Sequence, residues 1–352
     1  MKSEVDIVFA LLRAALGGGK DELPAMDTHQ WWSVFKLLRA NHVTALTAEA
    51  AVAQEIPREV KIPWLAECDK AVRWHRYQKE VQQDIIDTMQ KHDIETLVLK
   101  GTHTAQYYPR PELREFGDLD LYFYDRHDEA DRVASEMLKV TVSNDAHHHS
   151  KYNYRGVTVE SHYDFVNRHY PPSNRHYEAL LKSLVDEKNP LPTTHYPLPT
   201  CEILFLLRHM AGHFAASRIT LRDLVDWTLS CQALADKVDW GTVDKAIHDF
   251  GMEPFVSALN TIAEQRLGIH HSSLITHYPL PTTHYPLIEH DIVYGSVDDH
   301  TDDGIGRLGW KLRRWRALGW KRKMVYNDNS LRLLLSSLTS HATKPQSILH
   351  KM

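Results

Sequence analysis

The sequence lacks several features, and each absence excludes a class of protein. No apolar run reaches about 18 residues, the length that a membrane-spanning helix needs, so we expect no membrane partner. The chain has 3 cysteines, Cys68, Cys201 and Cys231, whose odd number and wide spacing predict reduced thiols in the cytoplasm rather than a disulfide framework. Early acidic residues, Glu4 and Asp6, argue against a secretory signal. The formal net charge of −5 argues against nucleic acid as a specific partner.

The hydrophobic pattern divides the chain into three regions. Residues 1–92 carry apolar side chains at helical spacing and are predicted to form an N-terminal helical region. Residues 93–170 contain short runs with strand periodicity, which predict an α/β core. Residues 171–352 are predicted to form a C-terminal helical domain with extended, proline-containing connectors. Residues 167–200, which are rich in proline, asparagine and histidine, are expected to be a connection. The expected fold is therefore mixed α+β, with a small mixed β-sheet flanked by helical regions.

One predicted strand of the core carries two acidic residues on one face. Side chains alternate along a strand, so Asp118 and Asp120 project from the same side, about 7 Å apart along the backbone. Two carboxylates this close repel each other. Mg²⁺ relieves the repulsion, because it takes oxygen ligands and often uses one or two carboxylates together with substrate phosphates. The alternative interpretation is a solvated polar face, which also produces an Asp-x-Asp pattern.

The stretch around this strand contains several residues with a characteristic spacing. They are Leu99-Lys100-Gly101, Tyr108-Pro109, Pro111, Arg114 and Gly117-Asp118-Leu119-Asp120. Together they resemble the fingerprint of a poorly characterised bacterial family within the DNA polymerase β-like nucleotidyltransferase superfamily. The resemblance is specific in residues 95–124 and extends more loosely over most of the chain. Two departures are Thr102, where the superfamily usually has serine, and a longer distance from Gly101 to Asp118.

The resemblance implies a third carboxylate on a later strand. Residues 152–154 and 157–163 predict a hairpin that turns at residues 155–156. Its second arm contains Val-Glu-Ser-His-Tyr, which is similar to a Val-Glu-Leu-His-Trp element of the family. We therefore expect Glu160 to complete a metal site with Asp118 and Asp120. His162 is expected to contact these ligands and so to orient them toward substrate or metal. The alternative is a histidine with satisfied hydrogen bonds and no role in the site.

Gly101 and three residues near it in the sequence are candidates for binding nucleotide phosphates. Gly101 allows the backbone to approach a ligand closely. The helix expected over residues 102–108 presents unpaired N–H groups at its start, and the Thr102 hydroxyl adds a donor. Lys100 and Arg114 are the nearest cations in the sequence for triphosphate charge, and arginine can bind phosphate bidentately.

These residues together predict a nucleotidyltransferase. It would move an NMP from an NTP, such as ATP, to an unidentified hydroxyl, phosphate or protein acceptor and release pyrophosphate. Asp118, Asp120 and Glu160 would be the catalytic residues and the ligands of Mg²⁺ or Mn²⁺, because paired cations neutralise the attacking and leaving oxygens. The alternative is a non-catalytic nucleotide-binding or regulatory protein on the same fold.

Two histidines in the C-terminal region have helical spacing. His209 and His213 place both rings on one face of a helix, which makes a zinc hydrolase a further alternative. Met210 stands where the His-Glu-x-x-His motif requires glutamate, and this argues against a zinc protease. The segment and the next predicted helix, which contains Asp226, also resemble the accessory helical domain of the family. These residues would line an acceptor pocket or lock two helices together.

Three other features are compositional. Residues 147–149 are consecutive histidines, which we interpret as a solvated loop rather than as a metal site. The octapeptide Leu-Pro-Thr-Thr-His-Tyr-Pro-Leu occurs at residues 191–198 and at 280–287, and its prolines predict extended connectors. Lysines and arginines alternate with tryptophans in residues 307–323. That stretch either binds nucleotide or an anionic acceptor, or docks as an amphipathic helix.

Overall fold

The computed structural model describes residues 3–19, 23–144, 146–185, 195–269, 285–295 and 307–343. The chain forms two compact units, each assembled from segments that are distant in sequence. Unit 1 comprises Met1–Val72, Tyr107–Glu115 and Leu207–Tyr326, and unit 2 comprises Arg73–Gln106, Phe116–Leu206 and Asn327–Met352. Two helices, α4 (Arg58–Gln90) and α8 (Pro199–Ala216), have residues in both units. The sequence division into regions 1–92, 93–170 and 171–352 stays a prediction.

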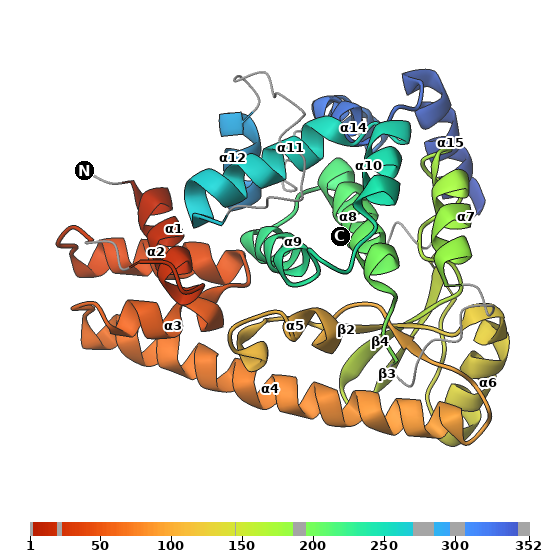
Figure 1. The fold of residues 1–352 in the computed structure, drawn as a ribbon, viewed down its shortest axis with the longest axis horizontal. Helices are drawn as coiled ribbons and strands as arrows, with labels where there is room; N and C mark the ends of the chain where they lie inside the picture. The colour runs from red at the N-terminus through yellow and green to blue at the C-terminus, as the bar shows by residue number, and fades with distance from the viewer. Residues whose placement is uncertain are drawn as a thin grey trace. The chain divides into compact units, whose positions relative to one another are not determined.

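Unit 1 is built from helices (Figure 1). The apolar residues Trp31, Val34, Phe35 and Leu38 are buried on one stripe of the second helix, as their spacing predicts. Asp27 caps this helix by accepting a hydrogen bond from the Gln30 N–H at 2.8 Å. Besides parts of α4 and α8, the helices of unit 1 are α1 (Glu4–Ala15), α2 (Thr28–Ala40), α3 (Thr44–Val52), α9 (Leu221–Ala233), α10 (Trp240–Asp249), α11 (Glu253–Ile262), α12 (Tyr285–Tyr294), α13 (Arg307–Ala317) and α14 (Gly319–Val325).

Unit 2 contains a four-stranded mixed sheet with strand order β1-β2-β4-β3. Strand β1 (Leu97–Val98) is antiparallel to β2 (Asp118–Tyr122), and β2 is parallel to β4 (Val157–His162). Strand β3 (His149–Tyr154) forms the predicted hairpin with β4. The sheet and its flanking helices confirm the mixed α+β fold that the sequence predicts.

One face of this sheet packs against helices. Leu119 and Val159 point to this face and are buried with Ile85 of α4 and Val133 of α6 (His127–Met137). Because side chains alternate along each strand, the opposite face receives the polar residues of β2 and β4. The remaining helices of unit 2 are α5 (Thr102–Ala105), α7 (Asn174–Leu184) and α15 (Ser330–Thr343).

Two sequence predictions about connections are wrong. Residues 167–200 are expected to be a connection, but residues 174–184 form α7, in which Tyr177 and Leu181 lie one turn apart and are both fully buried. This apolar pair stabilises a helix within a segment that is otherwise rich in polar residues. The second octapeptide copy is not wholly extended, since Tyr285, Pro286 and Leu287 begin α12. Proline is tolerated in the first turn of a helix. Both copies lie partly outside the described residues.

The basic, tryptophan-rich stretch makes internal contacts in unit 1. Lys321 is fully buried and forms an ion pair with Asp291 at 2.6 Å. The guanidinium of Arg322 lies over the Trp315 ring, 4.3 Å from its centroid. These contacts favour the docking interpretation for this part of the stretch.

Candidate functional site

The parallel pairing of β2 and β4 brings acidic residues of the two strands together. Asp118 is opposite Thr158, and Asp120 is opposite Glu160. Directly opposite residues of neighbouring strands project from the same face of a sheet. Asp118, Asp120 and Glu160 therefore share the face that is opposite the apolar core.

The side chains of Asp120, Glu160 and His162 converge on one position. Nε2 of His162 lies 3.2 Å from Oδ1 of Asp120 and 3.9 Å from Oε2 of Glu160. One candidate ligand atom from each residue lies within 4.8 Å of the other two. Asp120 is 2% exposed and His162 is 1% exposed, so water screens this group weakly.

The surroundings of His162 indicate how a cation would fit. Its Nδ1 lies 3.3 Å from the carbonyl oxygen of Asp164. If Nδ1 donates to this oxygen, the Nε2 lone pair faces Asp120 and Glu160, so that three acceptors meet. A divalent cation resolves this arrangement, and two carboxylates with one imidazole form a donor set that suits Mn²⁺ or another transition metal as well as Mg²⁺.

Two lysines partly neutralise the carboxylates. Nζ of Lys100 lies 3.4 Å from Oδ2 of Asp120, and Nζ of Lys151 lies 2.8 Å from Oε1 of Glu160. The position of Lys100 follows from the pairing of β1 with β2, in which the Leu99 N–H donates to the Asp120 carbonyl at 2.9 Å. The sequence interpretation selected Lys100 but missed Lys151, because its place beside Glu160 depends on the register of the hairpin.

These charges set the pKa values of two neighbouring groups. Burial and the charge of Asp120 raise the pKa of Glu160, but His149, His162 and Lys151 together hold it below its ordinary value. The Glu160 carboxylate is therefore ionised at neutral pH. Burial, together with the charge of His162, lowers the pKa of His149 to about 3, so that imidazole is neutral. Cations bind to the ionised form of a carboxylate and to the neutral form of an imidazole.

Gly101 occupies a backbone conformation that favours glycine. Its φ is 68°. A Cβ atom built at this position would lie 3.2 Å from the Phe116 ring and 3.5 Å from the carbonyl oxygen of Asp118. The glycine therefore allows the turn after β1 to pass close to the first residue of β2.

The helix that follows this turn is shorter than the sequence predicts. It ends at Ala105 rather than at Tyr108. Proline at position 109 disfavours helical geometry at Tyr108, which argues against a helix that reaches that residue. The Thr102 hydroxyl donates to Oε1 of Gln82 on α4 at 2.5 Å. Thr102 is thus connected to the helical layer of unit 2, and its contribution to phosphate binding stays a prediction.

Arg114 lies in unit 1, in a buried polar network. Its Nε and Nη2 atoms are each 2.7 Å from one carboxylate oxygen of Asp226. The Tyr108 hydroxyl donates to the same carboxylate at 2.6 Å. Arg114 is 4% exposed and Asp226 is 2% exposed. The network favours the locking role over the acceptor pocket for Asp226, and phosphate binding by Arg114 stays a prediction.

His209 and His213 lie one turn apart on α8, with ring centroids separated by 4.4 Å. Within the described ranges, two groups of three His, Cys, Asp or Glu side chains are close enough to share an ion, and neither includes these histidines. Catalytic zinc sites generally use three protein ligands. The geometry therefore gives no support to a zinc hydrolase at this position.

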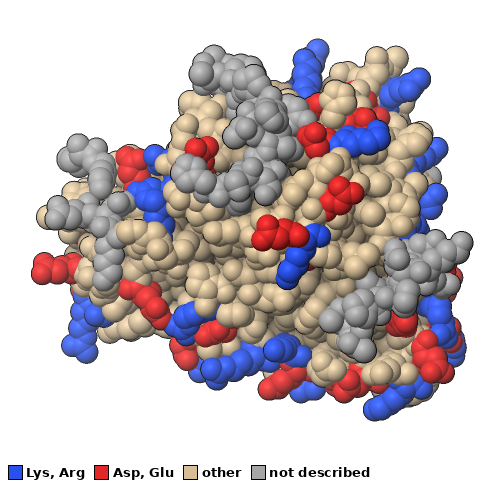
Figure 2. Space-filling model, in the orientation of Figure 1, with Lys and Arg blue, Asp and Glu red and all other residues tan. Residues whose placement is uncertain are grey.

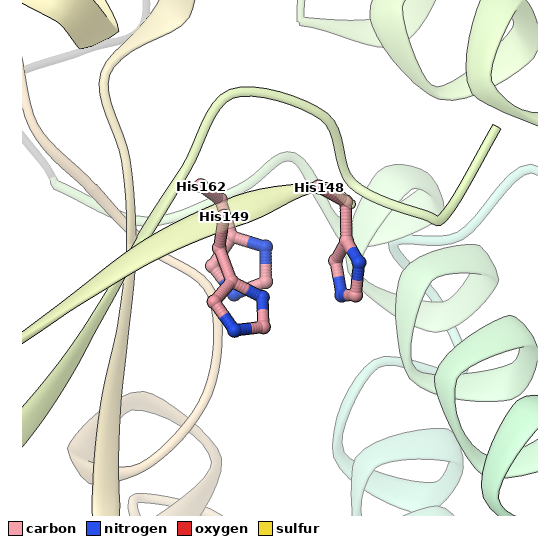
Figure 3. Close-up of side chains that lie close together, drawn as sticks. All are labelled: His148, His149 and His162. Carbon is pink, nitrogen blue, oxygen red and sulfur yellow. The ribbon is translucent and has the colours of Figure 1, made fainter. Parts of the chain in front are cut away.

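The interpretation of residues 147–149 as a solvated loop is wrong. His149 begins β3, and His147 and His149 are each 8% exposed. The second group of three candidate ligands consists of His148, His149 and His162 (Figure 3). The run of histidines was visible in the sequence. Its placement depends on the pairing of His149 with His162, which periodicity alone does not reveal.

The chain matches a family described as uncharacterised nucleotidyltransferase over residues 27–268. Because this match covers more than half of the 352 residues, the chain belongs to that family. The matched range includes the turn at Gly101 and the acidic residues of β2 and β4. No curated protein and no solved structure matches the chain.

Two further observations concern partners. In the part of the chain that the structure describes, every helix is too short or too polar to cross a membrane. On the face shown in Figure 2, the described Lys and Arg side chains are interspersed with Asp and Glu. On that face the described residues form no broad basic patch of the kind that nucleic-acid-binding surfaces present.

Proposed function

We propose that the protein is a metal-dependent nucleotidyltransferase of the DNA polymerase β-like superfamily. It transfers an NMP from an NTP to a hydroxyl, phosphate or protein acceptor and releases pyrophosphate. The observation that carries the proposal is the parallel register of β2 and β4, in which Asp120 is opposite Glu160 and Asp118 lies on the same face. Membership of a nucleotidyltransferase family supports the reaction class.

Asp118, Asp120 and Glu160 are the residues that would hold Mg²⁺ or Mn²⁺. Such cations supply neutralising charge to the attacking and leaving oxygens during an in-line displacement at phosphorus. The proximity of His162 to both Asp120 and Glu160 favours Mn²⁺, because imidazole is a better ligand for Mn²⁺ than for Mg²⁺. With Mg²⁺, His162 would instead orient Asp120 by hydrogen bonding.

The remaining residues of the site bind and orient the nucleotide. Lys100 is 3.4 Å from Asp120, so a phosphate oxygen near that carboxylate would come within reach of its ammonium group. Gly101 permits close approach of the backbone, and the Thr102 hydroxyl lies at the same turn. Glu160 is ionised at neutral pH and would hold a cation on the side of the acceptor.

The experiment that tests this proposal measures pyrophosphate release from each NTP with Mg²⁺ or Mn²⁺. An Asp118→Ala, Asp120→Ala double variant should lose the release. Asp128→Ala is the matched control, because Asp128 is a fully exposed aspartate of unit 2. Unchanged release by the double variant would contradict the assignment. Calorimetric binding of NTP by a protein that yields no product would instead identify a non-catalytic nucleotide-binding protein.

The acceptor and the cellular location belong to the same proposal. Incubation of the protein with labelled NTP, cation and a cell extract should transfer label to one class of molecule, which identifies the acceptor. The small number and wide spacing of the cysteines support a cytoplasmic location.

A further inference from the structure

Three imidazoles converge at one end of the sheet in unit 2. His148 directly precedes β3, His149 is the first residue of β3, and His162 is the last residue of β4. Figure 3 shows the rings of His149 and His162 next to each other, with the ring of His148 beside them. The ring centroids are 4.5 Å apart for His148 and His149, 5.5 Å for His148 and His162, and 5.1 Å for His149 and His162.

The ring nitrogens are close enough to share one ion. One nitrogen from each ring lies within 4.8 Å of the other two. In a tetrahedral zinc site, Zn–N bonds of about 2.0–2.1 Å separate two ligand nitrogens by about 3.3 Å. Closing this difference requires the rings to rotate toward one another. The strand pairing that places His149 opposite His162 already fixes two of the three ligands.

The Nδ1 atom of His149 has the environment expected of an atom that binds a metal ion. His149 is 8% exposed, and its Nδ1 atom is buried without a hydrogen-bond partner among the described residues. Buried polar atoms in proteins are nearly always satisfied, so such an atom needs an explanation. A metal ion bound at Nδ1 provides one.

The other nitrogens of the two buried rings face carboxylates. Nε2 of His149 lies 3.5 Å from Oε1 of Glu160, and Nε2 of His162 lies 3.2 Å from Oδ1 of Asp120. Histidines that bind metals commonly donate their second ring N–H to a carboxylate, which fixes the ring and increases its basicity. For His149 this arrangement leaves the unpartnered Nδ1 for the ion. For His162 the ion requires the opposite tautomer to the one that donates Nδ1–H to the Asp164 carbonyl: the ion would replace that contact, and Nε2–H would donate to Asp120.

We propose that His148, His149 and His162 bind one zinc ion, or a transition-metal ion with the same preference for imidazole, in a site that adjoins the carboxylate site and shares His162 with it. A set of three imidazoles selects such ions over Mg²⁺, which requires oxygen ligands. His162 and its carboxylate neighbours connect the two sites, so occupancy of one changes the environment of the other. The zinc site does not depend on the proposed transferase activity.

Zinc binding by the full chain tests the proposal. The protein is stripped with a chelator and titrated with Zn²⁺ in competition with a chromophoric chelator, and bound zinc is measured by elemental analysis. We expect one tightly bound equivalent. His148→Ala should weaken its binding by at least about 10-fold, because even residues that only orient metal ligands contribute 10–100-fold.

Two control variants separate this site from other histidines. His176→Ala removes an exposed histidine of unit 2, and His209→Ala removes the histidine pair of α8. Both should bind zinc as the unsubstituted chain does. Full zinc binding by His148→Ala, or loss of the equivalent in His209→Ala, would overturn the proposal.

A second measurement needs no variant. X-ray absorption spectroscopy of the zinc-loaded chain should show imidazole scattering from three histidines, whereas a shell of oxygen atoms alone would overturn the proposal. Neither measurement involves turnover. Zinc binding without pyrophosphate release would support this site alone, and pyrophosphate release without zinc binding would support the proposed function alone.

Discussion

Asp120 on β2 lies directly opposite Glu160 on β4 in a parallel pair, although β3 and α6 separate the two strands in the chain. The two carboxylates face the same nitrogen of His162. Each is also close to one lysine, Lys100 for Asp120 and Lys151 for Glu160. The two lysine side chains therefore stabilise a pair of acids that would otherwise repel each other.

Replacement of Glu160 by glutamine should abolish most activity while leaving the fold intact. Glutamine keeps the volume of the side chain but removes the charge that a cation requires. Residues that only hydrogen-bond to metal ligands contribute about 10–100-fold to metal affinity or activity. Loss of a ligand itself should therefore lower kcat by about 100-fold or more. The substitution also removes the ion pair between Glu160 and Lys151. Because the Lys151 side chain is 51% exposed, this loss should change the free energy of unfolding by less than about 1 kcal/mol.

The matched control for this substitution is Glu136→Gln. Glu136 is an exposed glutamate of α6 in the same unit and should show unchanged pyrophosphate release. A Glu160→Gln protein that keeps the kcat of the unsubstituted chain would remove Glu160 from the metal site.

Substitution of Gly101 by alanine should reduce both stability and activity. The φ of 68° is strained for alanine, at a cost of about 1–3 kcal/mol. The added Cβ would also contact the Phe116 ring at 3.2 Å and push the turn away from β2. Urea denaturation measures the first effect and kcat the second. Gly117→Ala is the control, because Gly117 has open space around its Cβ position and needs no left-handed φ. Equal stability of the two variants would contradict the argument.

The elements of the candidate site were predictable where local periodicity determines them. The alternation of Asp118-Leu119-Asp120-Leu121 correctly predicts a strand with an acidic face and an apolar face. The hairpin of β3 and β4 follows from two short runs with strand periodicity and the turn between them. In each case the residues that decide the structure are neighbours in sequence.

Long-range pairing was not predictable in the same way. His149 and Lys151 lie beside His162 and Glu160 because of a strand register that depends on packing of the whole sheet. Arg114 and Asp226 are distant in the chain, and no local pattern predicts their ion pair. The family resemblance identified Glu160 and Arg114 as noteworthy residues but gave no indication of the partners they have in the structure.

The stability of unit 2 should depend on pH through Glu178. Burial and the nearby charge of Asp164 raise the pKa of Glu178 to about 7, against hydrogen bonds from the Phe165 and Val166 N–H groups. A folded-state pKa above the ordinary value of 4.5 means that the folded state binds the proton more tightly. The free energy of unfolding should therefore fall as the pH rises from about 4.5 to about 7, by up to about 3 kcal/mol.

The Glu178→Gln variant isolates this contribution. Glutamine cannot titrate, so the difference in free energy of unfolding between the unsubstituted chain and the variant should change across this pH window and be constant above it. Urea denaturation at several pH values gives the difference. A difference that is independent of pH between 5 and 8 would show that Glu178 titrates at its ordinary pKa.

Removal of the Arg114 charge should destabilise unit 1. Arg114→Met removes the cation that binds the buried Asp226 carboxylate bidentately and leaves Arg222, 4.0 Å away, as the nearest remaining one. Breaking a buried pair costs about 3–5 kcal/mol. Asp226→Leu combined with Arg114→Met should cost less than the sum of the two single substitutions, since the double variant leaves no uncompensated charge. Urea denaturation measures these costs. The KM for NTP in folded Arg114→Met protein separates this structural role from the predicted phosphate binding, because an arginine that only pairs with Asp226 leaves the KM unchanged when it is removed. An increase in KM with unchanged stability would instead assign Arg114 to phosphate binding.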